Sequence, residues 1–229
     1  MDAAGPSSDP GCDGMSGFID YVTRHADDLL EATLEHLWLT GATLVLAIAL
    51  AAIVTMVCLR SRRLGDAVVE VLGAIYSIPS LALFALLIPL TGLGFTSAVI
   101  VMVVYCQFML VRNALEGIRG VDPDILEAAE GLGMSPRQVM IRVRLPLALP
   151  TIIAGVRLAA ISTIGIATIA ASINAGGLGL ILFSGLRTLD VDKILAGTLC
   201  CMALALVVDA LLKRLEALTS RGISLRELS

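Results

Sequence analysis

The sequence predicts an all-α membrane protein with about five transmembrane helices, and three observations carry that prediction. First, 57% of the 229 residues are hydrophobic and 16% are charged, whereas soluble domains contain about 45–50% apolar and about 25% charged residues. Second, long stretches carry no charge at all, the longest from 71 to 111. Third, arginines gather in the segments between apolar stretches, as they do in loops beside a membrane.

The chain begins with a polar tail and an acidic segment. Residues 1–17 are rich in Gly, Ser, Pro and Asp, without the basic start and apolar run of a secretory signal peptide, so we expect disorder there. Residues 18–36 carry apolar side chains close to helical spacing with acids between them. This pattern indicates an amphipathic helix on the external surface, although an ordinary solvated helix start fits it equally well.

Five apolar stretches are long enough to cross a bilayer, which takes about 20 residues each. The charge-free run is too long for one helix, and the turn signal Pro89–Gly94 divides it. Pro79 is expected to kink the second span. The predicted spans are 37–59, 71–89, 95–112, 147–172 and 194–212.

The segment after the fourth span is too short to cross. Asn174–Gly179, with the sequence NAGGLG, breaks the fourth span, and residues 180–186 follow as a short apolar run. We therefore expect a short re-entrant or interfacial helix before the last span.

The charges predict the orientation. The acidic N-terminal segment and the LTGLG turn fall on one side of the predicted spans, with Arg187 and Lys193 as basic exceptions. The other side holds the main basic clusters, so the positive-inside rule places the N-terminus outside and the C-terminus in the cytoplasm. These clusters contain Arg60, Arg62, Arg63, Arg112, Arg119, Arg137, Arg142, Arg144, Lys213, Arg214, Arg221 and Arg226.

A polar segment, residues 122–146, interrupts the apolar pattern on the predicted cytoplasmic side. Asp122-Pro123 is a helix start, and Gly133 permits a left-handed helix end. Ser135-Pro136 repeats the start signal, and the second helix is expected to end near Leu145 because Pro146 disfavours helix in its predecessor. The segment therefore predicts a helix-turn-helix protruding into the cytosol.

The first of these helices has features of a docking element. Ala128 and Ala129 give it a low surface that another backbone could approach closely, and Glu127 places a charge at the rim. A short rigid helix of this kind suits a groove in another protein. A plain interfacial connector between two spans is the alternative that these residues leave open.

The same segment resembles the EAA loop of ABC importer permeases. Glu-Ala-Ala is followed after three residues by Gly, and after nine more by Val-x-Leu-Pro, where the family has Ile-x-Leu-Pro. The resemblance implies a type I ABC transmembrane domain over 37–213, a coupling loop over 122–146 and a cytoplasmic tail over 214–229. It assigns ATPase coupling to Glu127, Ala128, Ala129, Gly133, Val143, Leu145 and Pro146.

The resemblance extends over about residues 35–215 and favours one branch of that family. The segments YSIPSLALFALLIPLTGLG and RNALEGIRGVDPD look most like osmoprotectant permeases, whose substrates are quaternary ammonium compounds such as glycine betaine, carnitine and choline. The AGGLG block also occurs in methionine importer permeases. A permease of a methionine or other amino-acid importer is therefore the alternative.

Polar groups inside spans are costly, so their positions indicate a solute path. We expect spans two, three and four to turn such groups towards a pathway at a permease–permease interface, although each hydroxyl could instead bond its own helix. The membrane aromatics form no cage that the sequence reveals, so high-affinity recognition is expected in a separate solute-binding protein. The candidate path residues are Ser77, Pro79, Ser80, Tyr105, Gln107, Thr163, Thr168, Ser172 and Asn174.

The charged residues near the spans have several possible partners. Arg157, flanked by apolar residues, could reach the cytoplasmic interface or pair with Asp66 or Glu70. Asp209 precedes Lys213 by four residues, which indicates a pair on one helix surface.

The resemblance implies an energy source outside this chain. The sequence lacks the Gly-x-x-x-x-Gly-Lys-Ser/Thr phosphate loop, so no enzyme activity is expected, and ATP and magnesium would bind to a partner ATPase. No cofactor and no metal site are expected here, because the two histidines have no ligand partner at useful spacing. Besides the ATPase, the expected partners are a second permease copy or homologous permease, an extracytoplasmic solute-binding protein and membrane lipid, but no nucleic acid. The expected location is the cell membrane of a bacterium or archaeon, crossed several times.

Overall fold

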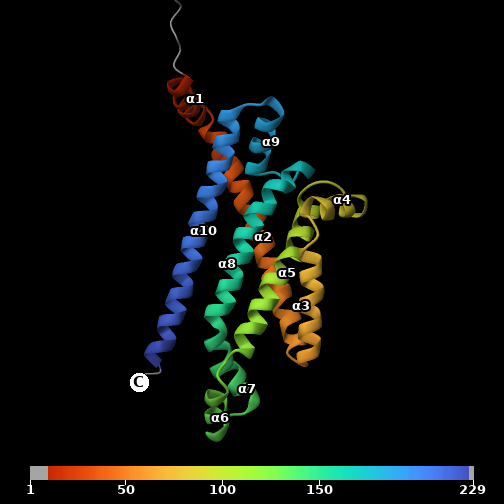
Figure 1. Cartoon of the computed structure of the whole chain (residues 1–229), viewed down its shortest axis with the longest axis vertical. Helices are drawn as coiled ribbons and strands as arrows, with labels where there is room; N and C mark the ends of the chain where they lie inside the picture. Colours follow the sequence, from red (N-terminus) through yellow and green to blue (C-terminus); the bar gives the residue numbers. More distant parts are fainter. Residues whose placement is uncertain (1–9, 227–229) are drawn as a thin grey trace, which may run out of the picture.

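The computed structural model describes residues 10–226, and these residues form helices joined by short loops, without a β-strand. Figure 1 shows the helices arranged side by side in an elongated bundle. In chain order they are α1 (Pro10–Arg24), α2 (Ala26–Cys58), α3 (Arg62–Tyr76), α4 (Ser80–Thr91), α5 (Phe95–Arg119), α6 (Pro123–Gly131), α7 (Pro136–Val139), the π-helix η1 (Met140–Arg144), α8 (Leu145–Ala170), the 3₁₀-helix η2 (Ala171–Ile173), α9 (Leu178–Thr188) and α10 (Val191–Arg226).

The prediction of about five spans is confirmed. Among the described residues, four helical stretches are long and apolar enough to cross a membrane: Ala26–Cys58, Phe95–Arg119, Pro136–Ile173 and Val191–Thr219. The pair α3 and α4 meets the same test only when the two helices are taken together. They are bent by 92° at their junction. The short helix α9 lies where the sequence places its re-entrant or interfacial segment.

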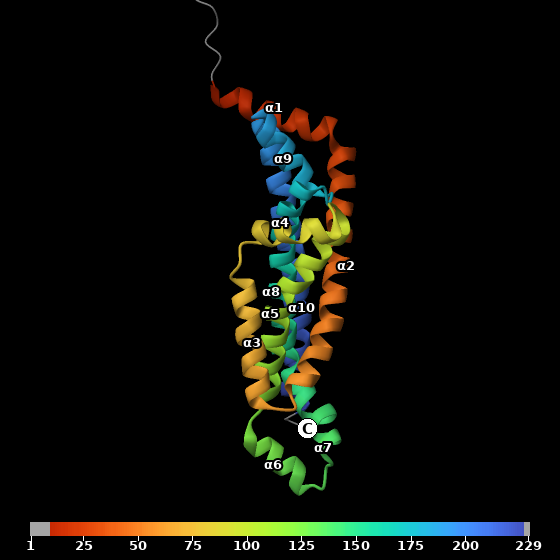
Figure 2. The ribbon, with the colours of Figure 1, turned by 90° about the vertical axis from the view of Figure 1, so that its right-hand side faces the viewer.

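The expected second span, 71–89, is wrong in shape. The chain is helical from Arg62, breaks at residues 77–79, and resumes as α4. Figure 2 shows α4 lying across the upright helices rather than continuing α3. Proline has no amide N–H and pushes the residue before it out of helical geometry, so Pro79 breaks the helix where we expected it to bend one.

The expected helix end before Pro146 is also wrong. The helix passes from α7 through η1 into α8 without interruption. In η1 the Leu145 amide N–H donates to the Met140 carbonyl, five residues back. This wider turn accommodates the missing N–H and the ring of Pro146, which a regular α-helix interior would not.

The basic clusters lie at one end of the bundle. Figures 1 and 2 place α6, α7, the start of α3 and the C-terminal end of α10 at that end, and α1 and α9 at the other. The arginines between α2 and α3 therefore share an end with those of α7 and η1. This arrangement matches the pattern from which the orientation was predicted.

The terminal segments differ from the sequence expectations. Residues 1–9 of the expected disordered tail lie outside the described residues, whereas 10–17 belong to α1. The expected amphipathic segment 18–36 is divided between α1 and the start of α2, because the helix breaks at His25. The expected tail 214–229 continues α10 as far as Arg226, and 227–229 are outside the described residues.

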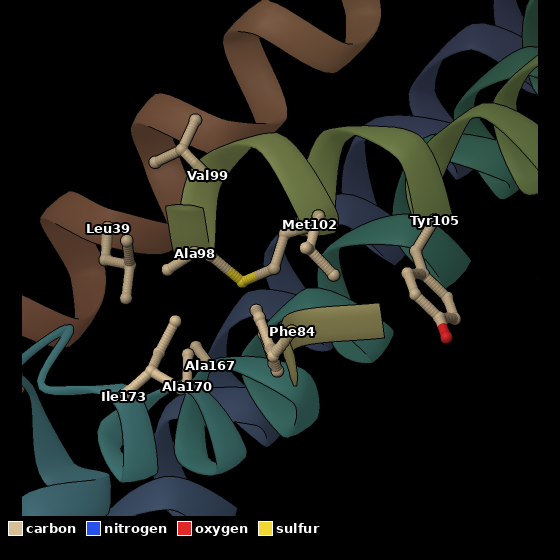
Figure 3. Packing of buried hydrophobic residues seen from close by; sticks show 10 residues of the cluster. Leu39, Phe84, Ala98, Val99, Met102, Tyr105, Ala167, Ala170 and Ile173 are labelled. Atoms are coloured by element: carbon tan, nitrogen blue, oxygen red, sulfur yellow. The ribbon is translucent and has the colours of Figure 1, made fainter. Parts of the chain in front are cut away.

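Phe84 anchors α4 to the bundle. Its side chain is fully buried, and Figure 3 shows it among side chains of α5 and α8. The surrounding cluster contains Leu39, Ala98, Val99, Val101, Met102, Tyr105, Ala167, Ala170 and Ile173. Van der Waals packing of such a side chain, rather than its transfer from water, therefore holds α4 across the bundle.

Small residues let α5 and α8 approach closely. A Cβ added to Gly117 would lie 3.1 Å from the Ala148 carbonyl oxygen, and one added to Gly155 would lie 2.6 Å from Asn113 Cβ. Close backbone approach at small residues is the usual way helices associate in membranes. This contact fixes the start of α8, and hence the exit from the polar segment, against the end of α5.

Candidate coupling segment and solute path

The helix starts that the sequence predicts in the polar segment are confirmed. The Asp122 carboxylate accepts a hydrogen bond from the Asp124 amide N–H at 2.9 Å. The Ser135 amide N–H donates to Gln138 Oε1 at 2.7 Å, while Ser135 Oγ accepts from the Gln138 N–H at 3.4 Å. These contacts satisfy amide groups that a helix N-terminus leaves unpaired.

Gly133 ends α6 in the left-handed conformation that the sequence predicts. Its φ is +80°, and the Gly133 and Met134 amides donate to the Glu130 and Ala129 carbonyls at 2.9 and 3.2 Å. This pair of bonds is a Schellman motif, in which glycine is favoured because a Cβ would strain the backbone. A cap at each end makes the nine-residue helix a defined unit.

We expected the two alanines of the Glu-Ala-Ala motif to form one low surface, but they do not share a surface. Ala128 is exposed together with Glu127, whereas only 6% of Ala129 is exposed. Ala129 therefore packs within the chain, and Ala128 alone offers a low surface to another protein.

Sequence reasoning missed Leu132. This side chain is 84% exposed at the end of α6, directly before Gly133. An apolar residue immediately before the helix-ending glycine was the available signal. A large exposed apolar side chain at the tip of a capped helix is a surface that a partner could cover.

Val143, Leu145 and Pro146 do not face outwards with α6. Val143 and Pro146 are half-buried in the helix leading into α8, and Leu145 is 40% exposed. They lie in the continuous helix 136–173, which the turn at residues 132–135 joins to α6.

The break between α3 and α4 gathers four of the candidate path residues. Ser77 Oγ donates to the Ala74 carbonyl at 2.7 Å, which ends α3. The Tyr105 hydroxyl of α5 donates to the Ile78 carbonyl. Pro79 and Ser80 begin α4. Residues 77–79 are exposed at this break, and broken helices of this kind line cavities in transporters.

Gln107 and Thr163 are buried in contacts between spans. Gln107 Nε2 donates to the Ala47 and Val103 carbonyls at 3.2 and 3.1 Å. Thr163 Oγ1 donates to the Ala159 carbonyl at 2.6 Å and lies 3.1 Å from Cys106 Sγ. Both side chains are engaged inside this chain, as the helix-bonding alternative predicts.

The remaining candidates lie near the end of the fourth span. Thr168 Oγ1 donates to the Gly165 carbonyl of its own helix at 2.7 Å. Ser172 is exposed in η2, and Asn174 is exposed in a left-handed conformation with φ 65°. Their exposure leaves Ser172 and Asn174 able to contact a solute or a neighbouring chain.

The structure brings together aromatic residues that the sequence did not connect. The rings of Tyr76 and Phe108 are stacked with centroids 5.3 Å apart, and Tyr105 meets Tyr76 edge-on at 5.5 Å. The Arg112 guanidinium lies 5.8 Å from the centroid of Phe108. An aromatic cluster therefore lies beside the α3–α4 break, although the sequence revealed no aromatic cage.

The described residues contain no group of three His, Cys, Asp or Glu side chains that could hold a metal ion.

The sequence family described as binding-protein-dependent transport system inner membrane component matches residues 43–221. The chain belongs to this family. Its members are permeases of ABC importers, located in the cell membrane, and ATP hydrolysis is the task of a separate subunit. An ATPase and a solute-binding protein are the partners that this membership implies.

Individual members resemble the chain along most of its length. The carnitine transport permease protein OpuCB of Listeria monocytogenes is 35% identical over 210 residues, covering 91% of this chain and 96% of the relative. The osmoprotectant import permease protein OsmW of Salmonella typhimurium is 37% identical over 211 residues, covering 90% and 98%. The MetNI methionine ABC transporter in an inward-facing crystal structure aligns with a TM-score of 0.73 at 19% identity, over 83% of this chain and 95% of that chain. At that identity the solved structure shows the shared fold only.

Proposed function

We propose that this chain is the permease subunit of an ATP-driven importer that carries a small quaternary ammonium osmoprotectant, such as glycine betaine, carnitine or choline, across the cell membrane. The observation that carries the proposal is the identity of 35–37% to curated carnitine and osmoprotectant permeases over about nine-tenths of the chain. The N-terminus faces outwards and the basic end of the bundle faces the cytoplasm in this proposal.

Helix α6 supplies the coupling contact. It is capped at both ends, protrudes at the basic end, and presents Ala128 and Leu132 without cover. In the proposal this surface seats in a groove of the ATPase, which holds ATP and magnesium. Closure of the ATPase would move α6, and the uninterrupted helix through η1 would transmit that movement to α8.

The solute path runs past the α3–α4 break. Ser77, Pro79, Ser80 and Tyr105 lie there, and Ser172 and Asn174 lie exposed at the end of the fourth span. Five spans are few to enclose a path, so a second permease copy or a homologous permease completes it. An extracytoplasmic binding protein delivers the solute.

An amino-acid importer permease is the second candidate, favoured by the fold shared with the methionine transporter. Fold alone does not determine substrate, and the aromatic cluster of Tyr76, Tyr105 and Phe108 suits a quaternary ammonium better than a free amino acid. The cation–π attraction is worth about 0.5–2 kcal/mol for each favourable ring contact.

The test is uptake by the complete importer, with its ATPase and binding protein, reconstituted in vesicles. Labelled glycine betaine, carnitine, choline and methionine are compared with ATP inside or withheld. We expect ATP-dependent uptake of at least one quaternary ammonium compound and none of methionine. Uptake of methionine alone would replace the osmoprotectant proposal with the second candidate, and uptake that ignores ATP would overturn the importer itself.

A further inference from the structure

A groove opens along the surface of α2, α5 and α8 at the end of the bundle that holds α6. Its volume is about 390 Å³. All the lining side chains are apolar except Thr55, and they come from the last turns of α2 and α5 and the first turns of α8. The lining residues are Ile48, Ala51, Ala52, Thr55, Met56, Leu59, Leu110, Ala114, Ile118, Met140, Leu145, Leu149, Ile152 and Val156.

Small residues create the groove. Ala52 of α2 and Ala114 of α5 line it, and a larger side chain at either position would fill part of the space. Larger neighbours leave it open to the surroundings: Met56 is 63% exposed and Leu149 is 37% exposed. Exposed apolar side chains on a membrane-spanning bundle face hydrocarbon, so a chain of methylene groups is the natural occupant of this space.

Arginines without a carboxylate partner adjoin lining residues of the groove in the sequence. Arg60 directly follows the lining residue Leu59, and Arg142 and Arg144 lie between the lining residues Met140 and Leu145. The stretches 36–65 and 131–156 contain no Asp or Glu. Among the described residues no carboxylate lies within ion-pair distance of the six arginines of these stretches, which are Arg60, Arg62, Arg63, Arg137, Arg142 and Arg144.

Other arginines of the chain form ion pairs, so the absence of a carboxylate partner is not a general property of its basic residues. Arg119 pairs with Asp66 at 2.6 Å, Arg112 with Glu116 at 2.8 Å, and Arg157 with Asp209 at 3.4 Å. Six arginines without a carboxylate partner therefore lie in the segments that line the apolar groove or adjoin it, while among the other described cations Arg187, Lys213 and Arg214 also form no ion pair.

We propose that this groove binds one acyl chain of an anionic phospholipid, with the headgroup phosphate held by Arg60 and Arg142. One amphiphile satisfies both features, since its tail fills the apolar space and its phosphate neutralises the guanidiniums. Arginine binds phosphate through paired N–H donors. The phosphate groups of zwitterionic and anionic lipids can both accept these hydrogen bonds. The arginines should prefer an anionic lipid because its headgroup carries a net negative charge. In a zwitterionic headgroup the positive charge of choline cancels the negative charge of the phosphate.

The position gives the site a consequence. Met140, the first residue of the π-helix η1 between α7 and α8, and Leu145, the residue that follows η1, both line the groove. A bound acyl chain would pack directly against the segment that joins the protruding helix to the fourth span. This inference does not depend on which solute is carried.

The experiment measures lipid retained by the purified complex of permease and ATPase. The complex is reconstituted with equal amounts of phosphatidylglycerol and phosphatidylcholine of the same chain length, and bound lipid is counted by native mass spectrometry. Two variants, Ala52→Trp and Ala114→Trp, fill the groove. Ile53→Trp, at a residue of α2 that does not line the groove and is 56% exposed, is the matched control.

The headgroup is tested with charge variants that need no change to the packed interior. Arg60→Gln with Arg142→Gln removes two positive charges at the groove, and Lys213→Gln with Arg214→Gln removes two from the exposed end of α10. All four side chains are exposed, so these variants test the proposal even where a tryptophan disturbs folding.

We expect the unmodified complex to retain phosphatidylglycerol in preference to phosphatidylcholine. The groove-filling variants lower that retention by about tenfold. The substitution of both Arg60 and Arg142 lowers the preference by about fivefold, which corresponds to roughly 1 kcal/mol. Both controls leave retention unchanged. Equal retention of the two lipids by the unmodified complex overturns the proposal, as does equal loss in both charge pairs. If Ala114→Trp instead separates the permease subunits, a second copy covers the groove and the lipid assignment is overturned.

Discussion

The guanidinium of Arg157 in α8 lies 3.4 Å from the carboxylate of Asp209 in α10. A second carboxylate of α10, that of Glu216, lies 3.5 Å from Arg157 Nε. The two acids are seven residues apart and so share a face of α10. Arg157 therefore joins the fourth and last spans, and the pairings with Asp66 or Glu70 and of Asp209 with Lys213 that the sequence suggested are wrong.

Replacing Arg157 should loosen this contact between α8 and α10. Arg157→Met leaves Asp209 and Glu216 near apolar surface, and their side chains are only 33% and 28% exposed. We expect a loss of about 1–3 kcal/mol in the free energy of unfolding, below the value for a fully buried pair because solvent screens part of the charge. Thermal unfolding in detergent measures it.

The control is Arg24→Met, which breaks an exposed pair with Asp20 in α1. That change should cost no more than about 0.5 kcal/mol. A double-mutant cycle of Arg157→Met with Asp209→Asn isolates the pairwise contribution. A coupling energy near zero in that cycle would show that the pair does not hold the two helices together.

Enlarging Ala128 should uncouple transport without unfolding the permease. Ala128 is exposed on α6, so Ala128→Trp costs little stability but obstructs a closely seated partner. We expect ATP-dependent uptake to fall at least about tenfold while the melting temperature stays within about 2 °C. The measurements are uptake by vesicles and thermal unfolding of the permease alone.

Ala129→Trp provides the contrast. Ala129 is 6% exposed, so the larger side chain must displace neighbours and should destabilise the fold by about 1–3 kcal/mol or more. Normal uptake by the Ala128 variant would contradict the assignment of α6 as the coupling helix.

Replacing Gly133 tests the Schellman end of α6. Gly133→Ala places a Cβ on a backbone with φ +80°, although no atom lies within 4 Å of that Cβ. The cost is therefore backbone strain alone, about 1 kcal/mol. Hydrogen exchange of the Gly133 and Met134 amides should accelerate about fivefold, and unchanged exchange would show that the turn does not depend on glycine.

Removing the hydroxyl of Tyr105 should disturb the α3–α4 break. Tyr105→Phe leaves the Ile78 carbonyl without its donor inside the bundle, which costs about 1–3 kcal/mol. Uptake should fall together with stability, because this hydrogen bond helps to hold the segment that leads into α4. Tyr76→Phe keeps the ring contacts with Phe108 and Tyr105 and serves as the control. Equal effects of the two variants would assign the loss to the rings rather than to the hydroxyl.

The loop before α9 offers one further test. The Gly177 amide N–H donates to Glu35 Oε2 at 3.0 Å, its φ is +77°, and an added Cβ would lie 2.9 Å from His36 Nδ1. Gly177→Ala should therefore destabilise the protein by about 1–3 kcal/mol. Gly41→Ala, with open space around it in α2, should be neutral or stabilising by up to about 1 kcal/mol in the same melting experiment.

The caps of the polar segment were predictable because they depend on residues close together in the chain. Asp122, Gly133 and Ser135 each act on amides or carbonyls within a few positions, and their geometry agrees with the prediction. The apolar stretches predicted the long spans for a similar reason, since the length of a span is set by the thickness of the bilayer.

The errors arose where packing decides between alternatives that the sequence permits. Pro79 breaks a helix, whereas Pro146 lies within a continuous one, because a π turn precedes Pro146 and the buried Phe84 fixes α4 across the bundle. Which of Ala128 and Ala129 faces outwards also depends on what α6 packs against.

The sequence by itself determined a multi-span helical membrane protein with a capped helix at its basic end, because hydropathy, charge distribution and cap residues act locally. The resemblance of residues 127–146 to the EAA loop is what indicated a permease. Only the tertiary structure decided which distant side chains meet. It paired Arg157 with Asp209, gathered three aromatic rings at the helix break, and left an apolar groove beside unpaired arginines. Those contacts depend on how helices far apart in the chain pack against one another, and no local pattern specifies that.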